Sequence, residues 1–215
     1  RMGGLVKSFA AVRFDEADAD LKTLINALQR YAHELKAIKA GQSAREIRQN
    51  IAKIESFSKS RPDLTTVKEF LEAEKATRIH TYHNGQLERL GDPSCATGLL
   101  WIRRSLEFQY HFFQQLLDGA DTSTATKTAY SKSLCNHHSW ILRKAYDIAL
   151  SVAARWGTNR SWMAELGGFK LQDFNESAEK ATRRDLESLL IIWKPLLRLM
   201  SGIFEQLELE DQTLA

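Results

Sequence analysis

One stretch near the middle of the chain constrains the fold more than any other: residues 99–113, LLWIRRSLEFQYHFF. Apolar side chains recur there, and just beyond, at the three- and four-residue spacing of a helix: Leu99, Ile102, Leu106, Tyr110, Phe113 and Leu117. Leu100, Phe108 and Phe112 add apolar area outside that stripe. A helix that is apolar on more than one face is normally buried. The sequence therefore predicts a domain organised around this helix.

The rest of the chain also has the pattern of helices. Only 3 Pro and 11 Gly occur in 215 residues, and the apolar–polar alternation of strands is absent. Helical spacing predicts further segments over residues 16–39, 44–59, 63–90, 127–134, 138–154 and 177–209, with breaks at residues 84–85 and 91–93. We therefore expect an all-α protein with about eight helices in a single domain, residues 5–210.

Several helix ends carry recognisable signals. Asp15 and Ser43 are placed to cap the first two segments, and Glu46 would complete a capping box with Ser43. Ser94 is placed to cap the central apolar helix. Pro195 should kink the last helix because it lacks the backbone N–H that the helix needs. The first four residues, RMGG, have the pattern of a frayed end.

Composition limits the classes of function. Hydrophobic residues make up 43% of the chain and the net charge is +3, which gives no case for a nucleic-acid binder but is compatible with weak attraction to an anionic membrane surface. No run of about 18 apolar residues exists to span a bilayer, and no signal segment opens the chain. Cys95 and Cys135 have no metal-binding spacing; two free thiols is the simpler interpretation, with a disulfide as the alternative.

A polar row follows the apolar face of the second predicted helix. Glu46, Asn50 and Lys53 are spaced i, i+4 and i+7, so they share one stripe of the helix. A carboxylate, an amide and an ammonium in line offer both acceptors and donors, which suits a ligand with many hydroxyl groups. A solvated helix face shows the same row, so the spacing alone leaves both interpretations open.

The central helix adds an aromatic platform and two cations. Trp101 and Arg104 are three residues apart and share a face, where an indole beside hydrogen-bonding groups could support a flat, polar ligand. Arg103 and Arg104 have the chemistry to bind a phosphate. Neighbouring arginines also commonly flank a buried helix with their stems packed on apolar surface.

The histidines do not form a metal site by their spacing. His137 and His138 are adjacent and so point to different helix faces, which favours a capping or core role over zinc. His80 and His83 are three apart but have no evident carboxylate partner. No nucleophile elbow, phosphate-binding glycine loop or zinc helix motif is present. We therefore expect no enzyme activity, no metal and no cofactor.

Three separated segments together resemble the glycolipid transfer protein family. Residues 46–54, EIRQNIAKI, are similar to the family's D-I-x-x-N-I-x-K motif. Residues 98–108, GLLWIRRSLEF, resemble its L-L-W-L-x-R-x-L-x-F helix, and residues 138–144, HSWILRK, its H-x-W-x-x-x-K segment. Their order and separation fit, and the resemblance extends from about residue 21 to residue 204.

The resemblance implies a two-layer sandwich of helices that encloses the hydrocarbon chains of one sphingolipid, with a surface site for the headgroup. By the family pattern Trp101 would stack under the first sugar, while Asn50 and Lys53 would hydrogen-bond sugar hydroxyls. His138 would hold the amide carbonyl of the ceramide. Trp140 would lie at the membrane-contact surface, where tryptophan is favoured.

Glu46 departs from the family pattern, which has aspartate at this position. By the resemblance its carboxylate would accept from the ceramide amide N–H and from a sugar hydroxyl. Glutamate reaches one methylene further than aspartate. We therefore expect an altered headgroup fit with the charge unchanged.

A branch of the same fold carries ceramide-1-phosphate, with lysine at the position of Asn50 and arginine at that of Trp101. Phosphate needs cations, whereas a sugar needs an aromatic face and neutral donors. Asn50 and Trp101 therefore favour a glycosphingolipid, while Lys53, Arg103 and Arg104 keep ceramide-1-phosphate as the alternative. A sphingolipid sensor or scaffold is the other alternative. We expect a cytoplasmic monomer that visits membrane surfaces transiently.

Overall fold

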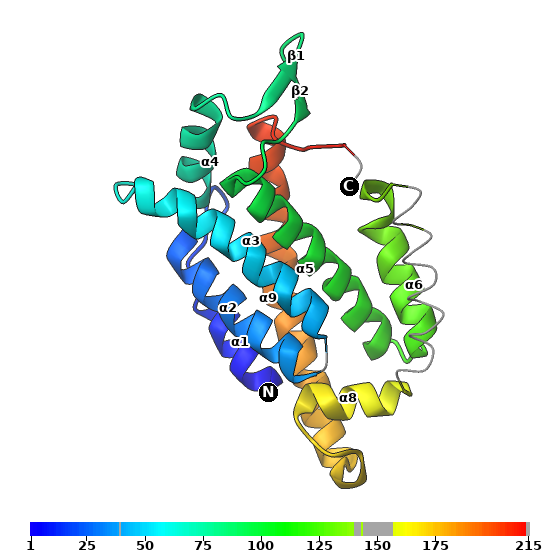
Figure 1. Cartoon of the computed structure of the whole chain (residues 1–215). Helices are drawn as coiled ribbons and strands as arrows, with labels where there is room; N and C mark the ends of the chain where they lie inside the picture. The colour runs from blue at the N-terminus through cyan, green and yellow to red at the C-terminus, as the bar shows by residue number, and fades with distance from the viewer. Residues whose placement is uncertain (39, 140–142, 144–156, 214–215) are drawn as a thin grey trace. The chain divides into compact units, whose positions relative to one another are not determined.

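A computed structural model describes residues 1–38, 40–139, 143 and 157–213. Its α-helices are α1 (Met2–Ala10), α2 (Leu21–Ala37), α3 (Gly41–Ser60), α4 (Val67–Ala76), α5 (Cys95–Leu117), α6 (Thr122–Lys132), α8 (Asn159–Gly167) and α9 (Glu176–Gln206) (Figure 1). Short 3₁₀ turns occur at η1 (Cys135–His137) and η2 (Leu171–Asp173), and the strands β1 (Thr81–His83) and β2 (Gln86–Arg89) form one hairpin. Eight α-helices thus lie within the described residues, and the all-α prediction is confirmed.

The chain forms two compact units, which are described separately. The α3 unit comprises Ser8–Arg103 and Pro195–Thr213, and the α6 unit comprises Arg1–Lys7 and Arg104–Lys194. The helices α5 and α9 supply residues to both units.

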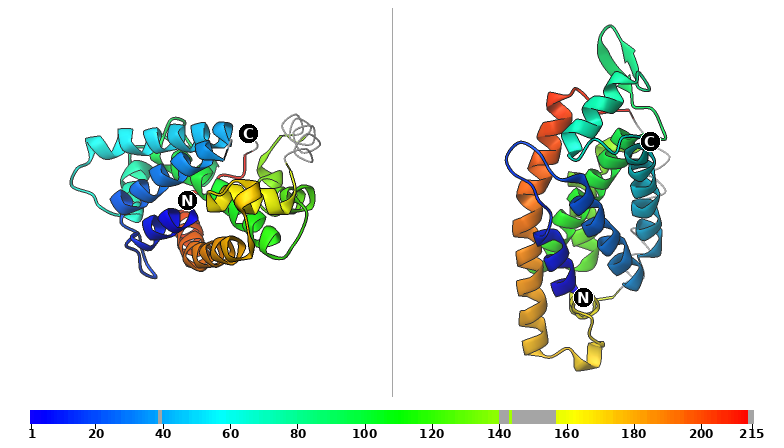
Figure 2. Two further views of the ribbon diagram at one scale, coloured as in Figure 1. Left: turned by 90° about the horizontal axis from the view of Figure 1, so that it is seen from below. Right: turned by 90° about the vertical axis from the view of Figure 1, so that its left-hand side faces the viewer.

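The core of the α3 unit lies where α2 packs on α3, and the two helices run side by side in all views (Figures 1 and 2). Leu24 and Leu28 of α2 and Ile54 of α3 are completely buried. Burying one such side chain contributes about 1.5–3 kcal/mol. The helical spacing of these residues therefore explains both the helices and their contact.

The amino-terminal end of α5 is fixed tightly in the α3 unit. The Ser94 Oγ accepts the Thr97 N–H at 3.0 Å, which confirms Ser94 as its cap. The buried carboxylate of Glu74 accepts the N–H groups of Cys95 and Ala96, each at 2.7 Å. These hydrogen bonds satisfy donors that a helix start leaves unpaired. Burial raises the pKa of Glu74, and the two backbone hydrogen bonds oppose that shift.

Gly98 lets α5 approach α3 closely. A Cβ at this position would lie 2.7 Å from the Asn50 carbonyl oxygen and 3.0 Å from Ile54 Cγ1. Only glycine permits this approach without a shift of the backbone. The first turns of α5 are thereby held against the part of α3 that carries Asn50 and Lys53.

Aromatic rings form the core of the α6 unit. Phe113 of α5 stacks on the buried Trp193 of α9 with ring centroids 5.9 Å apart, and Phe112 meets Trp162 of α8 edge-on at 5.4 Å. The side-chain amide of Asn159, at the start of α8, donates to the carbonyl oxygens of Leu116 and Ala120. Along α9, which supplies residues to both units, the apolar residues predicted for the last helix are buried: Leu186, Leu189, Leu190 and Trp193 in the α6 unit, and Leu197, Met200 and Phe204 in the α3 unit.

Several predicted helix ends are wrong by a few residues. Helix α2 begins at Leu21 and is capped by Asp20, whereas Asp15 accepts the N–H groups of Ala17 and Asp18 in a preceding turn. Helix α3 starts before Ser43, so Ser43 lies inside it and no side chain caps it. For α2 the sequence offers a second capping carboxylate, Asp20, five residues after Asp15, whereas α3 begins without a side-chain cap at Ala40.

The hairpin β1–β2 and the helix α1 were missed. Asn84 and Gly85 have φ angles of +50° and +79°, the left-handed pair that a two-residue hairpin turn requires, so the Asn-Gly break was in fact a hairpin signal. At the start of the chain Met2 and Leu5 are buried in α1, so residues 1–4 are not a frayed end.

The last helix, α9, continues through Pro195. Among the described residues, no helix has the length and apolar character needed to cross a membrane.

Candidate functional site

The polar row of α3 is present as predicted, with burial that varies along it. Glu46 is exposed, Asn50 is 9% exposed and Lys53 is half-buried. The adjacent stripe, Ile47, Ile51 and Ile54, is buried and anchors the helix. The row therefore runs from solvent at Glu46 into the contact with α5 at Asn50.

Glu46 is held by its own helix. Its carboxylate accepts a hydrogen bond from Gln42 Nε2, one turn earlier, at 2.9 Å. This neighbour directs the longer glutamate side chain along the solvent face of α3. The carboxylate stays available to further donors because each of its oxygens can accept more than one hydrogen bond.

Asn50 is the buried member of the row. Within the described part of the chain, no group hydrogen-bonds to its side-chain amide. The residue as a whole is buried, but its amide atoms are not fully enclosed, so they remain accessible to water or to a ligand. Asn50 can therefore offer both a donor and an acceptor to a bound polar group.

Lys53 forms an ion pair with the loop that precedes α5. Its Nζ lies 2.7 Å from Asp92 Oδ1, and the two side chains are 23% and 58% exposed. The ammonium retains further donors because only one direction is used by Asp92.

Trp101 lies one turn after Gly98 on α5 and is half-buried. Residues three apart share a helix face, and Gly98 contacts α3 at Asn50 and Lys53. Trp101 therefore lies on the face of α5 that is turned toward the polar row, within the same unit.

The two arginines of α5 have different surroundings. Arg103 is 5% exposed, donates from Nη2 to Glu210 Oε1 at 2.7 Å and lies over the ring of Phe204. It thus ties the carboxyl-terminal segment to α5. Arg104 is also buried, at 1% exposure, and belongs to the α6 unit.

His138 lies in the α6 unit beside a tyrosine. Its Nδ1 is 3.2 Å from the Tyr130 hydroxyl, and its carbonyl oxygen accepts from Arg143 Nε at 2.8 Å. Burial lowers the pKa of His138, and the positive charges of Arg143 and Arg104 lower it further. Both effects favour the neutral form of the ring. When Nδ1 accepts from the hydroxyl, Nε2 carries the proton and can donate to a carbonyl group.

The other predictions about histidine and cysteine are resolved in part. Among the described residues, no group of three His, Cys, Asp or Glu side chains is placed to bind a metal. His80 is buried and its Nδ1 accepts the Gly91 N–H at 3.1 Å, which is a structural role. Cys95 and Cys135 are both free thiols. Trp140, the predicted membrane contact, lies outside the described residues.

Two residues of this site were missed in the sequence. The sequence indicates Asp92 only as part of a Gly-Asp-Pro turn, although it lies two residues before Ser94, the cap of α5, and therefore close to the elements that pack on the start of α5. Tyr130 gave no signal, because a tyrosine on an apolar face ordinarily belongs to the core.

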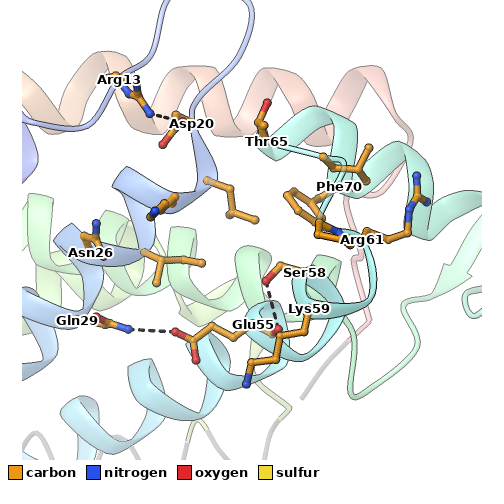
Figure 3. Close-up of a pocket in the computed structure, with 15 residues that line it drawn as sticks. Arg13, Asp20, Asn26, Gln29, Glu55, Ser58, Lys59, Arg61, Thr65 and Phe70 are labelled. Carbon is orange, nitrogen blue, oxygen red and sulfur yellow. Dashed lines mark hydrogen bonds and ion pairs between the residues drawn. The ribbon is translucent and has the colours of Figure 1, made fainter.

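A separate hollow of about 640 Å³ lies in the α3 unit between α2, the end of α3 and the start of α4 (Figure 3). Polar side chains at its rim bind one another: Arg13 pairs with Asp20 at 2.7 Å, and Gln29 donates to Glu55 at 3.0 Å (Figure 3). None of the residues of the polar row lines it.

Solved structures of other proteins show which fold the chain has. A structure that shows how FAPP2 selects simple glycosphingolipids using the GLTP fold superposes with a TM-score of 0.78 at 20% identity, covering 96% of this chain and 95% of that one. The apo form of mouse ceramide-1-phosphate transfer protein gives 0.79 at 18% identity, covering 98% of each chain. The chain therefore has the GLTP fold.

The sequence comparison defines the family. The family model described as glycolipid transfer protein (GLTP) matches residues 18–158, well over half of the chain, so the chain belongs to the glycolipid transfer protein family, a family of lipid-transfer proteins. A zebrafish (Danio rerio) relative, pleckstrin homology domain-containing family A member 8, is 26% identical over 164 residues. The match covers 75% of this chain but only 28% of that relative.

Proposed function

We propose that this protein binds one glycosphingolipid, with the sugar headgroup at the α3 row and Trp101 and the acyl chains in an apolar interior, and moves it between membranes. Residues 5–210 would form the lipid-binding domain. The protein would carry out no chemical step and need no cofactor or metal.

The observation that carries this proposal is the side-chain amide of Asn50 beside the α3–α5 contact, which has no hydrogen-bond partner among the described residues and remains accessible to a ligand. A sugar hydroxyl both donates and accepts, so it can satisfy an amide group on both sides. The half-buried indole of Trp101 on the same side of α5 offers the apolar ring face on which a sugar packs. Lys53 and Glu46 would extend the hydrogen bonding along the row.

His138 is the group proposed to hold the ceramide amide carbonyl. In the tautomer whose Nδ1 accepts from Tyr130, the ring N–H is at Nε2, and this is the group that would donate to the carbonyl. Because the amide is common to all ceramides, this contact would add affinity without selecting a headgroup.

Apolar burial makes the transfer reversible and independent of a fuel. Each CH₂ group moved out of water contributes about 0.8 kcal/mol of favourable free energy. An apolar protein interior and a membrane therefore stabilise the acyl chains to a similar extent. Headgroup selection must then come from the polar site, because apolar pockets discriminate weakly between chain lengths.

Ceramide-1-phosphate is the second candidate cargo, because Lys53, Arg103 and Arg104 are cations of α3 and α5. Lys53 is paired with Asp92, and Arg103 is paired with Glu210. These pairings favour a neutral headgroup over a phosphate.

We also propose that the protein acts as a cytoplasmic monomer with transient membrane contacts, at which Trp140 would lie. The free thiols of Cys95 and Cys135 suit a reducing compartment. A net charge of +3 suits weak attraction to anionic lipid surfaces.

The proposal is tested by transfer of fluorescent lipids between vesicles, with galactosylceramide, ceramide-1-phosphate and phosphatidylcholine compared. We expect galactosylceramide to move fastest, and Trp101→Ala to slow it at least about 10-fold because the ring platform is lost. Trp101→Phe should retain part of the rate. Faster movement of ceramide-1-phosphate would instead establish the second candidate.

A matched control separates the site from the helix that carries it. Tyr110 is another half-buried aromatic residue of α5, nine positions after Trp101. Tyr110→Ala should leave the preference for galactosylceramide intact, and circular dichroism should show that both variants remain helical. Equal loss of headgroup preference in the two variants would contradict the assignment of Trp101.

A further inference from the structure

We propose that Asp92 sets the headgroup selectivity of this site: paired with Lys53, it cancels a cation that would otherwise attract phosphate, and it presents a carboxylate to sugar hydroxyls. This inference rests on the proposed function. It concerns a loop residue outside the three motifs that carry the family resemblance.

The geometry places Asp92 beside the proposed headgroup. Its Oδ1 lies 2.7 Å from Lys53 Nζ, so a hydroxyl bound by that ammonium is also within reach of the carboxylate. The Asp92 side chain is 58% exposed, which leaves its oxygens accessible to further donors. A carboxylate accepts several hydrogen bonds, and it supplies none to a phosphate.

The loop that carries Asp92 is fixed on both sides. The N–H of Gly91 donates to the buried His80 Nδ1 at 3.1 Å, and the Gly91 carbonyl oxygen accepts from Thr97 Oγ1 at 2.8 Å. On the other side, Ser94 caps α5. Asp92 is therefore held in place before any ligand arrives, and its pairing with Lys53 does not depend on a mobile loop.

The stem of Lys53 is fixed as well. The Cβ position of Gly98 would lie 3.4 Å from Lys53 Cβ, so the lysine begins at the close α3–α5 contact. With both partners fixed, the ion pair presents no net charge to the headgroup. A phosphate would approach the carboxylate and the ammonium together, and repulsion by the carboxylate would offset the attraction.

The test is the ratio of ceramide-1-phosphate to galactosylceramide transfer from otherwise identical vesicles. Asp92→Asn keeps the size of the side chain and an oxygen that can accept from Lys53, while it removes the charge. We expect the ratio to rise about 5-fold, because removing one exposed charge close to a phosphate removes a repulsion that water already screens. Asp92→Glu should keep the ratio near that of the wild type.

Two controls separate an effect on selectivity from an effect on charge or folding. Asp63 is 61% exposed and pairs with Arg61 at 2.9 Å, so Asp63→Asn makes the same charge change on a similarly exposed pair and should leave the ratio unchanged. In a Lys53→Gln background, Asp92→Asn should change the ratio much less, because Asp92 acts partly through Lys53.

The outcomes distinguish this inference from the proposed function. A wild-type protein that moves galactosylceramide, with an unchanged ratio in Asp92→Asn, would overturn the role of Asp92 alone. A ratio that rises equally in Asp63→Asn would also overturn it, because general charge would then explain the change. A wild-type protein that moves neither lipid would overturn both proposals.

Discussion

Two ion pairs of the α3 unit join the same kinds of atoms at the same distance, 2.7 Å, yet their surroundings differ. Lys53 and Asp92 have side chains that are 23% and 58% exposed, whereas those of Arg103 and Glu210 are 6% and 22% exposed. Arg103 also lies over the Phe204 ring. One pair borders the proposed headgroup site, and the other ties the carboxyl-terminal segment to α5.

The comparison shows that two ion pairs of equal length can differ in burial, and burial determines how much each contributes to stability and how accessible its charges are to a ligand. An exposed pair contributes little to stability because water and salt screen it, so its charges stay available to a ligand. A buried pair is costly to break, because the remaining charge is left without a partner in a poorly solvating environment. We therefore expect Arg103–Glu210 to govern stability and Lys53–Asp92 to govern selectivity.

The largest effect is expected from breaking the buried pair. Glu210→Gln should lower the free energy of unfolding by about 3 kcal/mol, since it removes the negative charge that pairs with the buried Arg103 guanidinium. Urea denaturation measures this change. The ratio of ceramide-1-phosphate to galactosylceramide transfer should stay as in the wild type; a shift in that ratio would remove the division of roles between the two pairs.

The next largest effect should come from a change at Gly98, where α5 packs closely on α3. Gly98→Ala puts a methyl group 2.7 Å from the Asn50 carbonyl oxygen, so α5 must move away from α3. We expect a loss of about 2 kcal/mol in stability together with slower galactosylceramide transfer, since both depend on this approach. Thermal unfolding and vesicle transfer on the same preparation would show it. Alanine is a better helix former than glycine, so an unchanged or higher stability would contradict the close contact.

A smaller effect is expected from the exposed pair. Asp92→Asn should change the free energy of unfolding by less than about 1 kcal/mol, while it changes the headgroup ratio. Urea denaturation measures the change in the free energy of unfolding, and lipid transfer with the same preparation measures the change in the headgroup ratio. A stability loss as large as that of Glu210→Gln would show that the two pairs do not differ as their burial indicates.

The smallest and most gradual effect is expected from pH. Burial lowers the pKa of His80 below its ordinary value of 6.5, so between the two values the unfolded chain holds more protons than the native protein. The contribution of the neutral, buried His80 to the free energy of unfolding is therefore fully present above about pH 6.5. It declines as the pH falls from 6.5 through the lowered pKa of His80 in the folded protein. His80 accepts the Gly91 N–H beside Asp92, so this decline should loosen the exposed pair.

Urea denaturation at several pH values between 5 and 8 measures this slope, and His80→Gln should make it shallower. His111 and His138, whose pKa values are also lowered chiefly by burial, act in the same direction. Glu74, whose pKa burial raises, acts in the opposite direction at the acidic end. An identical slope in His80→Gln would exclude a contribution from His80.

The sequence predicted what depends on periodicity and local chemistry. The apolar stripe of residues 99–117 and the buried face of the last helix follow from helical spacing, as does the alignment of Glu46, Asn50 and Lys53. The Ser94 cap follows from a short side chain placed just before an apolar run. These features need no knowledge of distant contacts.

The features that the sequence did not predict are of two kinds. Some depend on which of two similar residues caps a helix, and others depend on contacts between residues far apart in the chain. Asp15 and Asp20 are both suitable capping residues, and the structure uses Asp20, whose side chain accepts the Thr23 N–H. The pairing of Lys53 with Asp92 and of Arg103 with Glu210 joins residues far apart in the chain. Neither pairing has a local signal, and together they distinguish the role of Lys53 from that of Arg103.

The most direct test of the central claim is native mass spectrometry of the protein after incubation with vesicles that contain equal amounts of galactosylceramide and ceramide-1-phosphate. We expect one bound lipid per chain with the mass of galactosylceramide, and loss of that adduct in Trp101→Ala. A predominant ceramide-1-phosphate adduct would contradict a sugar-binding site at Asn50 and Trp101. Absence of any bound lipid would contradict the proposed carrier function itself.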